Sequence, residues 1–431
     1  LLAPILAAGG SGSSGFGGGG GGGGGGGFSG GGGGSGGPAG TGSLAVFLVI
    51  VAVVAVVVVM ALIGSWRLRR RRAERVARVR LAAAEAAEDD PAFAPDRVGA
   101  DAAALFAAVQ RAWDARDRAA LGELLGADLL AEWTRRLDDF DAKGWHNRVK
   151  LLGAPRVEYV GLVNRPADAE DRVVVRLEAA LEDYVETASG RIVTKTGQTS
   201  RMTALREYWT LGKRDGGWRL LSIEQDAEGA HQLDAPIVAS PWGDDERLRD
   251  QSLTELAVAD AAPHGVRPGE LADLDFDGSA RAAALDLALA DPRFDPAVLE
   301  AAVRRVVAAW VEAVDGADAP LEAVAAPAAV DALLYDSDAT RRTRLVVRGA
   351  RAERVTVERL EAAAEPPAMV VAVTVRGRRY VQDRDTAAIL SGSDARDDVF
   401  TARWRLTLDG PPAAPWRLAG PADAPARPAT A

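Results

Sequence analysis

Glu207 is the residue in this sequence that best fits a catalytic role. Alternation over Leu205–Leu211 places it on the same strand face as Trp209 and two leucines. A carboxylate on an apolar face can have a raised pKa and act as the general base of an isomerase or hydrolase, although structural ion pairs give the same pattern more often. The later tryptophan Trp404 is preceded at the same spacing by Ala402. We therefore predict no enzymatic activity and keep a pocket enzyme using Glu207 as the alternative.

Metal and cofactor chemistry has little support in the residue types. The chain has no cysteine, and its histidines, His146, His231 and His264, show neither H-x-x-x-H nor H-E-x-x-H spacing. His146 follows an apolar helical pattern that ends near Phe140, so we expect it in the last turn, where a histidine suits the helix dipole. The sequence predicts no metal site and no cofactor.

Aromatic residues supply the remaining candidates for a ligand pocket. The tryptophans stand at helical and strand spacing, which is more typical of core packing than of a binding site. On the strand around Arg176 the apolar residues take one face, and Arg176, Glu178 and Glu182 lie on the other. The two carboxylates, Glu178 and Glu182, are therefore expected to face solvent. The full set of candidate pocket residues is Trp113, Trp133, His146, Tyr159, Glu207, Trp209 and Trp218.

These candidates are carried by helices followed by strands. One apolar helical face runs from Leu105 to Trp113, and a second continues over Leu121–Phe140. Period-two segments with turn residues between them follow, which is the order expected of an α+β protein with an antiparallel sheet. The predicted strands are Arg156–Val163, Arg172–Val185, Arg201–Lys213 and Trp218–Gln225.

The second half of the chain repeats the spacing of the first. Trp113 and Trp209 are 96 residues apart, and Trp310 and Trp404 are 94 apart. Each later tryptophan precedes another on a strand pattern, Trp218 and Trp416. Matched spacings of this kind predict two copies of one fold, the second of them degenerate.

A hydrophobic segment near the start predicts a membrane anchor. Leu44–Ile63 is uncharged and free of proline, and at about 1.5 Å per residue such a helix crosses a hydrocarbon core of about 30 Å. The flanking residues Trp66, Arg67, Arg69, Arg70, Arg71 and Arg72 are typical of a membrane interface. By the positive-inside rule the arginine side is cytoplasmic and the glycine-rich N-terminal side is outside.

Charge and composition limit the kinds of molecule that this chain is expected to bind. The formal charge of −10 argues against a nucleic-acid binder, and the arginine run beside the span favours contact with anionic lipid. The sequence LLAPILAA at the start is typical of the end of a secretory signal peptide. The predicted segments are a signal remnant 1–8, a disordered glycine-rich part 9–43, a span 44–64, a basic helix 65–90, a first domain 91–227, a helical linker 228–292, a second domain 293–420 and a disordered tail 421–431.

Two segments, Leu137–Tyr159 and Leu205–Ile223, resemble the mitochondrial inner-membrane translocase subunit 44-like domain, over roughly 100–225. The resemblance implies a nuclear transport factor 2-like fold, with helices on a curved antiparallel sheet and a pocket between them. The family's namesake recruits a chaperone to an import channel and touches lipid. This chain departs from it in having its own anchor and a second copy and no mitochondrial presequence. We predict a membrane-tethered binding or scaffold protein that holds a protein partner or apolar ligand, with a lipid carrier or sensor as a further alternative.

Overall fold

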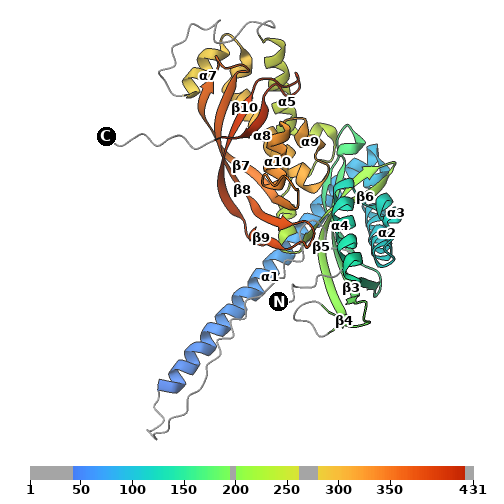
Figure 1. Ribbon diagram of the computed structural model, residues 1–431. Helices are drawn as coiled ribbons and strands as arrows, with labels where there is room; N and C mark the ends of the chain where they lie inside the picture. The colour runs from blue at the N-terminus through green and yellow to red at the C-terminus, as the bar shows by residue number, and fades with distance from the viewer. Residues whose placement is uncertain (1–41, 195–199, 262–279, 423–431) are drawn as a thin grey trace. The chain divides into compact units, whose positions relative to one another are not determined.

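The computed structural model of the chain describes residues 42–194, 200–261 and 280–422 (Figure 1). The expected signal remnant 1–8, nearly all of the glycine-rich part 9–43 and most of the tail 421–431 lie outside these residues. The chain divides into two units, 18–78 and a larger one that runs from Val79 onward.

The anchor segment is a long helix, α1 (Gly42–Asp89). The predicted span and the predicted basic helix are one helix without a break at residue 64. Among the described residues it is the one helix long and apolar enough to cross a membrane, judged by length and composition. Apolar side chains along it are exposed, for example Val56 and Met60, as a span surrounded by lipid requires.

The larger unit holds two similar helix-and-sheet modules, of which the first follows α1 directly. Its helical elements pack on one face of the first sheet around a shared apolar core. The last turns of α1 belong to that core through Val79, Ala83 and Ala86. The helical elements are η1 (Pro91–Phe93), α2 (Pro95–Asp114), α3 (Arg118–Leu124) and α4 (Ala127–Lys143).

The single helix predicted over Leu121–Phe140 is wrong, because the structure breaks it into α3 and α4. The break lies at Gly126, whose N–H donates to the carbonyl of Leu220 at 2.7 Å. A side chain on Gly126 would approach Leu221 to 2.9 Å, so glycine allows this close contact between the helices and the sheet. Tertiary pairing with the sheet therefore overrides the helical periodicity.

The first sheet is antiparallel, with the order β1-β3-β5-β6 and with β2 and β4 also paired to β3. All four predicted strands are confirmed within a residue or two. The strand β1 was missed, because Gly144 at φ +63° caps α4 and the chain turns straight into a strand where a loop was expected. The strands are β1 (His146–Leu151), β2 (Arg156–Val163), β3 (Arg172–Glu186), β4 (Ile192–Val193), β5 (Met202–Arg214) and β6 (Gly217–Gln225).

The outer face of β3 carries a buried arginine and the two carboxylates that were expected to face solvent. Arg176 is buried, with Nε donating to Asp226 at 2.7 Å and Nη1 to Glu178 at 2.7 Å. The turn that follows β6 carries Asp226 over this face. Glu178 and Glu182 are partly exposed.

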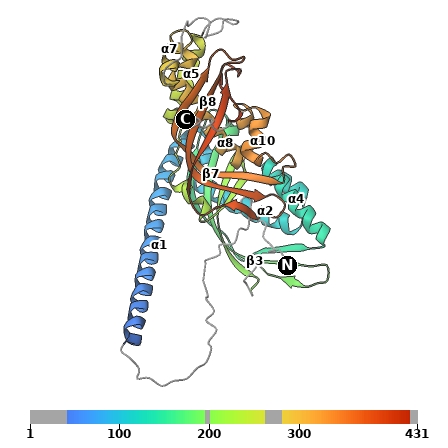
Figure 2. The ribbon, with the colours of Figure 1, turned by 60° about the vertical axis from the view of Figure 1, so that its left-hand side comes forward.

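The second module repeats the same arrangement. Helices α8 and α10 lie against the curled sheet formed by β7 and its neighbours, whose order is β11-β10-β8-β7 with β9 beside β8 (Figures 1 and 2). The elements are η5 (Pro292–Phe294), α8 (Pro296–Asp315), α9 (Ala319–Glu322), α10 (Pro327–Tyr335), β7 (Thr343–Glu361), β8 (Ala368–Asp383), β9 (Ile389–Gly392), β10 (Asp398–Thr407) and β11 (Arg417–Pro421).

A repeated Asp-Pro-x-Phe-x-Pro motif shows how closely the copies correspond. It begins at Asp90 in the first copy and at Asp291 in the second, and in both the aspartate caps the turn that precedes a 20-residue helix. Its phenylalanine packs edge-on against the last tryptophan of its own module, Trp218 or Trp416. Aligning the helices by this motif puts Trp310 one turn earlier than Trp113, so these two tryptophans do not occupy equivalent positions.

The described residues of the segment between the copies include several helical elements. These are η3 (Glu228–Leu233), η4 (Pro241–Gly243), α5 (Asp245–Ala259) and α7 (Ala280–Ala288), while η2 (Asp168–Glu170) lies within the first sheet's connections. The helix predicted over Asp244–Ala262 corresponds to α5. Ala257 and Leu287 are buried in the second core, so α5 and α7 are part of that module's packing.

Candidate functional site

The candidate pocket tryptophans fill the first core. Trp113 packs edge-on against Trp133 with ring centroids 4.8 Å apart, and Trp209 packs against Phe106 at 5.1 Å. Trp218 lies 5.5 Å from Phe93, and its indole donates to the carbonyl of Ala92. None of the four tryptophans lines the cleft of about 470 Å³ or the smaller cavity of about 180 Å³. All four belong to the buried core of the first module.

Glu207 is buried as predicted, but its carboxylate is engaged by neighbouring side chains. Trp209 donates through Nε1 to Oε2 at 2.9 Å, and Gln225 donates through Nε2 to Oε1 at 3.2 Å. Both partners lie on the same small stretch of β5 and β6. This arrangement supports the structural role over that of a general base.

Tyr159 and His146 lie in different environments. Tyr159 is buried, and burial raises the pKa of its phenol. His146 is the first residue of β1, and its Nε2 donates to the carbonyl of Asp114 at 2.7 Å. The expected place of His146 in a last helical turn is therefore wrong, because α4 ends at Lys143. Its ring nevertheless serves the end of a helix, that of α2.

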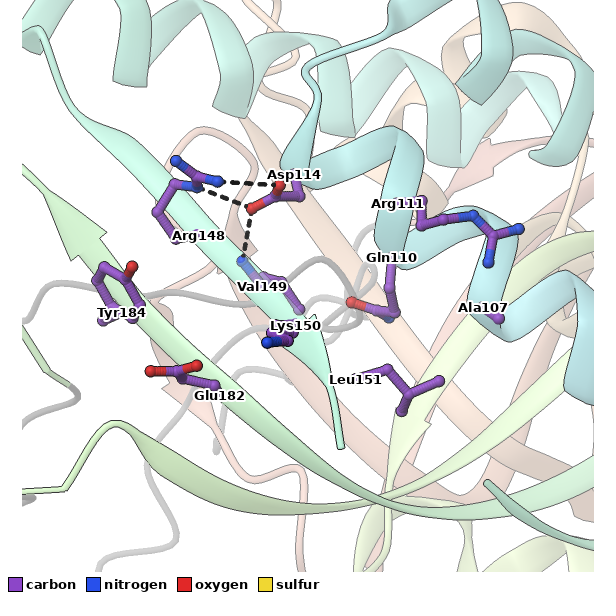
Figure 3. Close-up of a pocket in the computed structure, with 10 residues that line it drawn as sticks. All are labelled: Ala107, Gln110, Arg111, Asp114, Arg148, Val149, Lys150, Leu151, Glu182 and Tyr184. Carbon is purple, nitrogen blue, oxygen red and sulfur yellow. Dashed lines mark hydrogen bonds and ion pairs between the residues drawn. The ribbon is translucent and has the colours of Figure 1, made fainter. Parts of the chain in front are cut away.

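An open cleft of about 470 Å³ lies between α2 and the edge strand β1. Figure 3 shows side chains from α2 on one wall and from β1 and β3 on the other. Because β1 ends the strand order, the cleft runs along a free sheet edge. The lining residues are Ala107, Gln110, Arg111, Asp114, Arg148, Val149, Lys150, Leu151, Glu182 and Tyr184.

Asp114, the last residue of α2, organises the cleft. Its Oδ1 accepts hydrogen bonds from Arg148 Nε at 3.0 Å and from the backbone N–H of Val149 at 2.9 Å (Figure 3). The bond from Val149 shows that this N–H points away from β3, toward the free edge. Arg148 keeps two-fifths of its side-chain surface exposed, so its guanidinium can accept a second anionic partner.

Gln110 is the unusual group in this cleft. It is 2% exposed, and neither its amide nitrogen nor its amide oxygen has a hydrogen-bond partner among the residues described. A buried polar group without a partner costs about 1–3 kcal/mol of stability. A site that retains such a carboxamide is suited to a ligand with both a donor and an acceptor, such as a peptide amide.

The second copy contains the same arrangement in a filled state. Asp315 ends α8 as Asp114 ends α2, and Arg348 of β7 forms an ion pair with Asp315 as Arg148 does with Asp114. Here the arginine is fully buried, because η3 from the segment after β6 covers it. Arg348 Nε donates to Glu228 Oε1 at 3.0 Å, and Tyr380 donates to the same oxygen at 2.6 Å.

Charge within this junction is well compensated. Burial raises the pKa of Glu224, but the charge and hydrogen bond of His231, with Arg348, outweigh it and lower that pKa to about 2. Burial and the nearby Glu228 carboxylate both raise the pKa of Tyr380. Glu224, Glu228 and Arg348 thus form a network between the two modules in which the acidic groups are held ionised or hydrogen-bonded.

Sequence reasoning missed the residues of the cleft. A usable signal existed, since Asp114 and Arg148 are 34 residues apart and Asp315 and Arg348 are 33 apart. The Gln110 carboxamide has no hydrogen-bond partner among the described residues, and only the folded structure shows this.

A family model described as the Tim44-like domain matches residues 79–225. The match begins within α1 at Val79, where the first core begins, twelve residues before the predicted boundary at 91.

Solved structures also match. One, titled "Crystal structure of intermembrane space region of chloroplast protein ARC6", has a TM-score of 0.24 and 12% identity, over 30% of this chain and 95% of that one. Another, titled "Ntf2 like protein involved in plasmid conjugation", has a TM-score of 0.19 and 8% identity, over 64% of this chain and 79% of that one. No curated protein matches the chain.

Proposed function

Residues 79–225 form a Tim44-like domain, and from that premise we propose that the chain is a membrane-tethered binding protein and not an enzyme. In this proposal α1 anchors it in the cell membrane, and the two modules lie on the cytoplasmic side. The Tim44-like domain then holds a protein partner in the cleft between α2 and β1.

The observation that carries the proposal is the buried carboxamide of Gln110, which has no hydrogen-bond partner in the part of the chain that the structure describes. An apolar ligand would leave this group unsatisfied, whereas a polypeptide offers amide groups that pair with it. The lipid-carrier alternative needs an apolar cavity, but the tryptophans that could line one pack against aromatic side chains of the core. The enzyme alternative needs a reactive Glu207, and that carboxylate is bonded to Trp209 and Gln225.

The residues that flank the span support the proposed contact with lipid. Trp66 and the arginines that follow it lie on α1, and the Arg70 guanidinium stacks over the Trp66 ring at 5.8 Å. An amphipathic ring beside a cluster of cations suits the level of anionic headgroups. The same arginines are the basis for placing the C-terminal modules in the cytoplasm.

Partner binding is tested by photocrosslinking in intact cells. A photoreactive amino acid in place of Lys150, in the cleft, is expected to give one dominant protein adduct with the full-length chain. The control replaces Ala131, which is exposed on α4 outside the cleft. Equal adduct patterns at both positions, or no adduct at Lys150, would contradict the proposal.

Topology is tested by cysteine labelling, which the absence of native cysteine makes simple. Ser13→Cys in the glycine-rich segment is expected to react with an impermeant maleimide added to intact cells. Asp215→Cys, in the exposed β5–β6 hairpin, is expected to react only after the membrane is opened. Both expectations follow from the positive-inside rule. Labelling of Asp215→Cys from outside intact cells would reverse the proposed orientation.

A further inference from the structure

We propose that the cleft binds an acidic polypeptide segment, one carboxylate of which is held by Arg148 and Tyr184 while Gln110 pairs with a main-chain amide. This inference rests on the proposed protein-binding function and names the chemistry of the partner. The observation behind it is internal to the chain, because the second copy shows the corresponding cleft occupied.

The occupant of the second cleft is a polypeptide segment with a glutamate at its contact point. Glu228, at the start of η3, places its carboxylate between Arg348 and Tyr380. Its backbone carbonyl accepts a hydrogen bond from Arg378, and Arg351 donates to the carbonyl of Asp234 at 2.7 Å. Side-chain and main-chain groups of the segment are thus both recognised.

The first cleft has the same recognition elements without the occupant. Arg148 and Tyr184 face each other in register across β1 and β3. In the second copy Arg378 takes the position opposite Arg348, and Tyr380 follows two residues along β8. Each copy therefore has an arginine on the edge strand that pairs with the aspartate at the end of the helix, and a tyrosine on the next strand.

The balance of charge also favours an acidic ligand. The ionisable residues of the lining are three cations, Arg111, Arg148 and Lys150, and two acids, Asp114 and Glu182, which gives a net charge of 3 − 2 = +1. Arg111 and Lys150 have no ion-pair partner within the described ranges, although Glu182 stands opposite Lys150 in the ladder. A charge-assisted hydrogen bond from this wall to a carboxylate is stronger than one to a neutral group.

Arg148 can hold two acids at once, as its counterpart does. Arg348 keeps its ion pair with Asp315 while it donates to Glu228 and lies 3.7 Å from Glu224. Arg148 donates to Asp114 through Nε and Nη2. The rest of its guanidinium is accessible in the cleft.

The test uses a synthetic peptide that copies residues 222–234, the segment that fills the second cleft, with a fluorophore at its end. Full-length protein in lipid nanodiscs is titrated and fluorescence anisotropy is measured. Loss of one charge-assisted bond is worth about tenfold or more in affinity, so the peptide with Glu228→Gln is expected to bind at least about tenfold more weakly. Absence of saturable binding, or equal binding of the two peptides, would overturn the inference.

Protein variants locate the site. Gln110→Leu and Tyr184→Phe are each expected to weaken binding by about tenfold. Gln110→Leu is also expected to unfold at the same or a higher temperature than the wild type, because it removes a buried group without a partner. Gln251→Leu, the same substitution on an exposed part of α5, is the matched control and should leave binding unchanged. Unchanged binding by Gln110→Leu would exclude this cleft as the site.

A photoreactive group on the peptide separates the two clefts. Cross-links to residues of α2 or β1 support the inference, whereas cross-links confined to β7 would mean that the peptide had displaced the chain's own segment, and would overturn it. If crosslinking at Lys150 captures a partner in cells but the acidic peptide does not bind, the protein-binding function stands and the acidic specificity fails. If both fail, the proposed function fails as well.

Discussion

Replacing Arg348 with methionine is expected to lower the free energy of unfolding by about 3–5 kcal/mol, because breaking a buried ion pair leaves its partners uncompensated. Arg348 is fully buried and is the cation shared by Asp315, Glu228 and Glu224. Methionine fills similar space but cannot neutralise these acids. Chemical denaturation of the full-length protein in detergent, followed by tryptophan fluorescence, measures the change.

Arg354→Met is the matched control, since Arg354 is exposed on the same strand, β7, and its loss should change stability by less than about 0.5 kcal/mol. Adding Glu228→Gln to Arg348→Met should cost less than the sum of the two single changes, because both act on one network. If Arg348→Met and the wild type unfold at the same midpoint concentration of denaturant, the network does not hold the two modules together.

Truncating the phenylalanine of the repeated motif is expected to cause the second large loss of stability. Phe93→Ala and Phe294→Ala should each lower the stability of their own module by about 3–5 kcal/mol, the usual loss for a buried phenylalanine. Both side chains are fully buried, and each packs edge-on against the last tryptophan of its own module, Trp218 or Trp416. Hydrogen exchange read by mass spectrometry assigns the loss to one module or the other.

Phe400→Ala provides the comparison, because Phe400 is only partly buried against Trp310 and should have a clearly smaller effect. If Phe93→Ala speeds exchange equally in both modules, the two cores are not separate cooperative units. If neither phenylalanine variant alters exchange, the repeated motif has no structural role in either copy.

Much of the first module could be predicted from local pattern. The alternation around Trp209 placed β5 correctly and identified Glu207 as buried, since one face of that strand packs on the helices. Alternation also placed Arg176 on the outer face of β3, but it could not show that a later turn covers this face and buries the guanidinium. The strand β1 was also missed. Its residues His146, Arg148 and Lys150 alternate with Asn147, Val149 and Leu151, and the strand begins just after the cap at Gly144.

The unusual state of Gln110 in the cleft could not be predicted from the sequence, for a different reason. Gln110 sits beside Val109 on a helix, where an isolated polar residue is usually satisfied by a neighbour or by water. Only the folded arrangement shows that its amide has no partner in the described structure. The duplication was recognised from tryptophans, and the more informative pairs, Asp114 with Arg148 and Asp315 with Arg348, emerged once the helices were aligned by their ends.

The filled cleft of the second module has a consequence for how the two copies can diverge. Arg148, at the open cleft, keeps two-fifths of its side-chain surface exposed, so water can solvate its partner when the arginine is replaced. Arg348 and Glu228 are both fully buried and paired, so replacing either one alone leaves a buried charge without its partner. The first copy is therefore expected to tolerate substitution of its arginine better than the second copy.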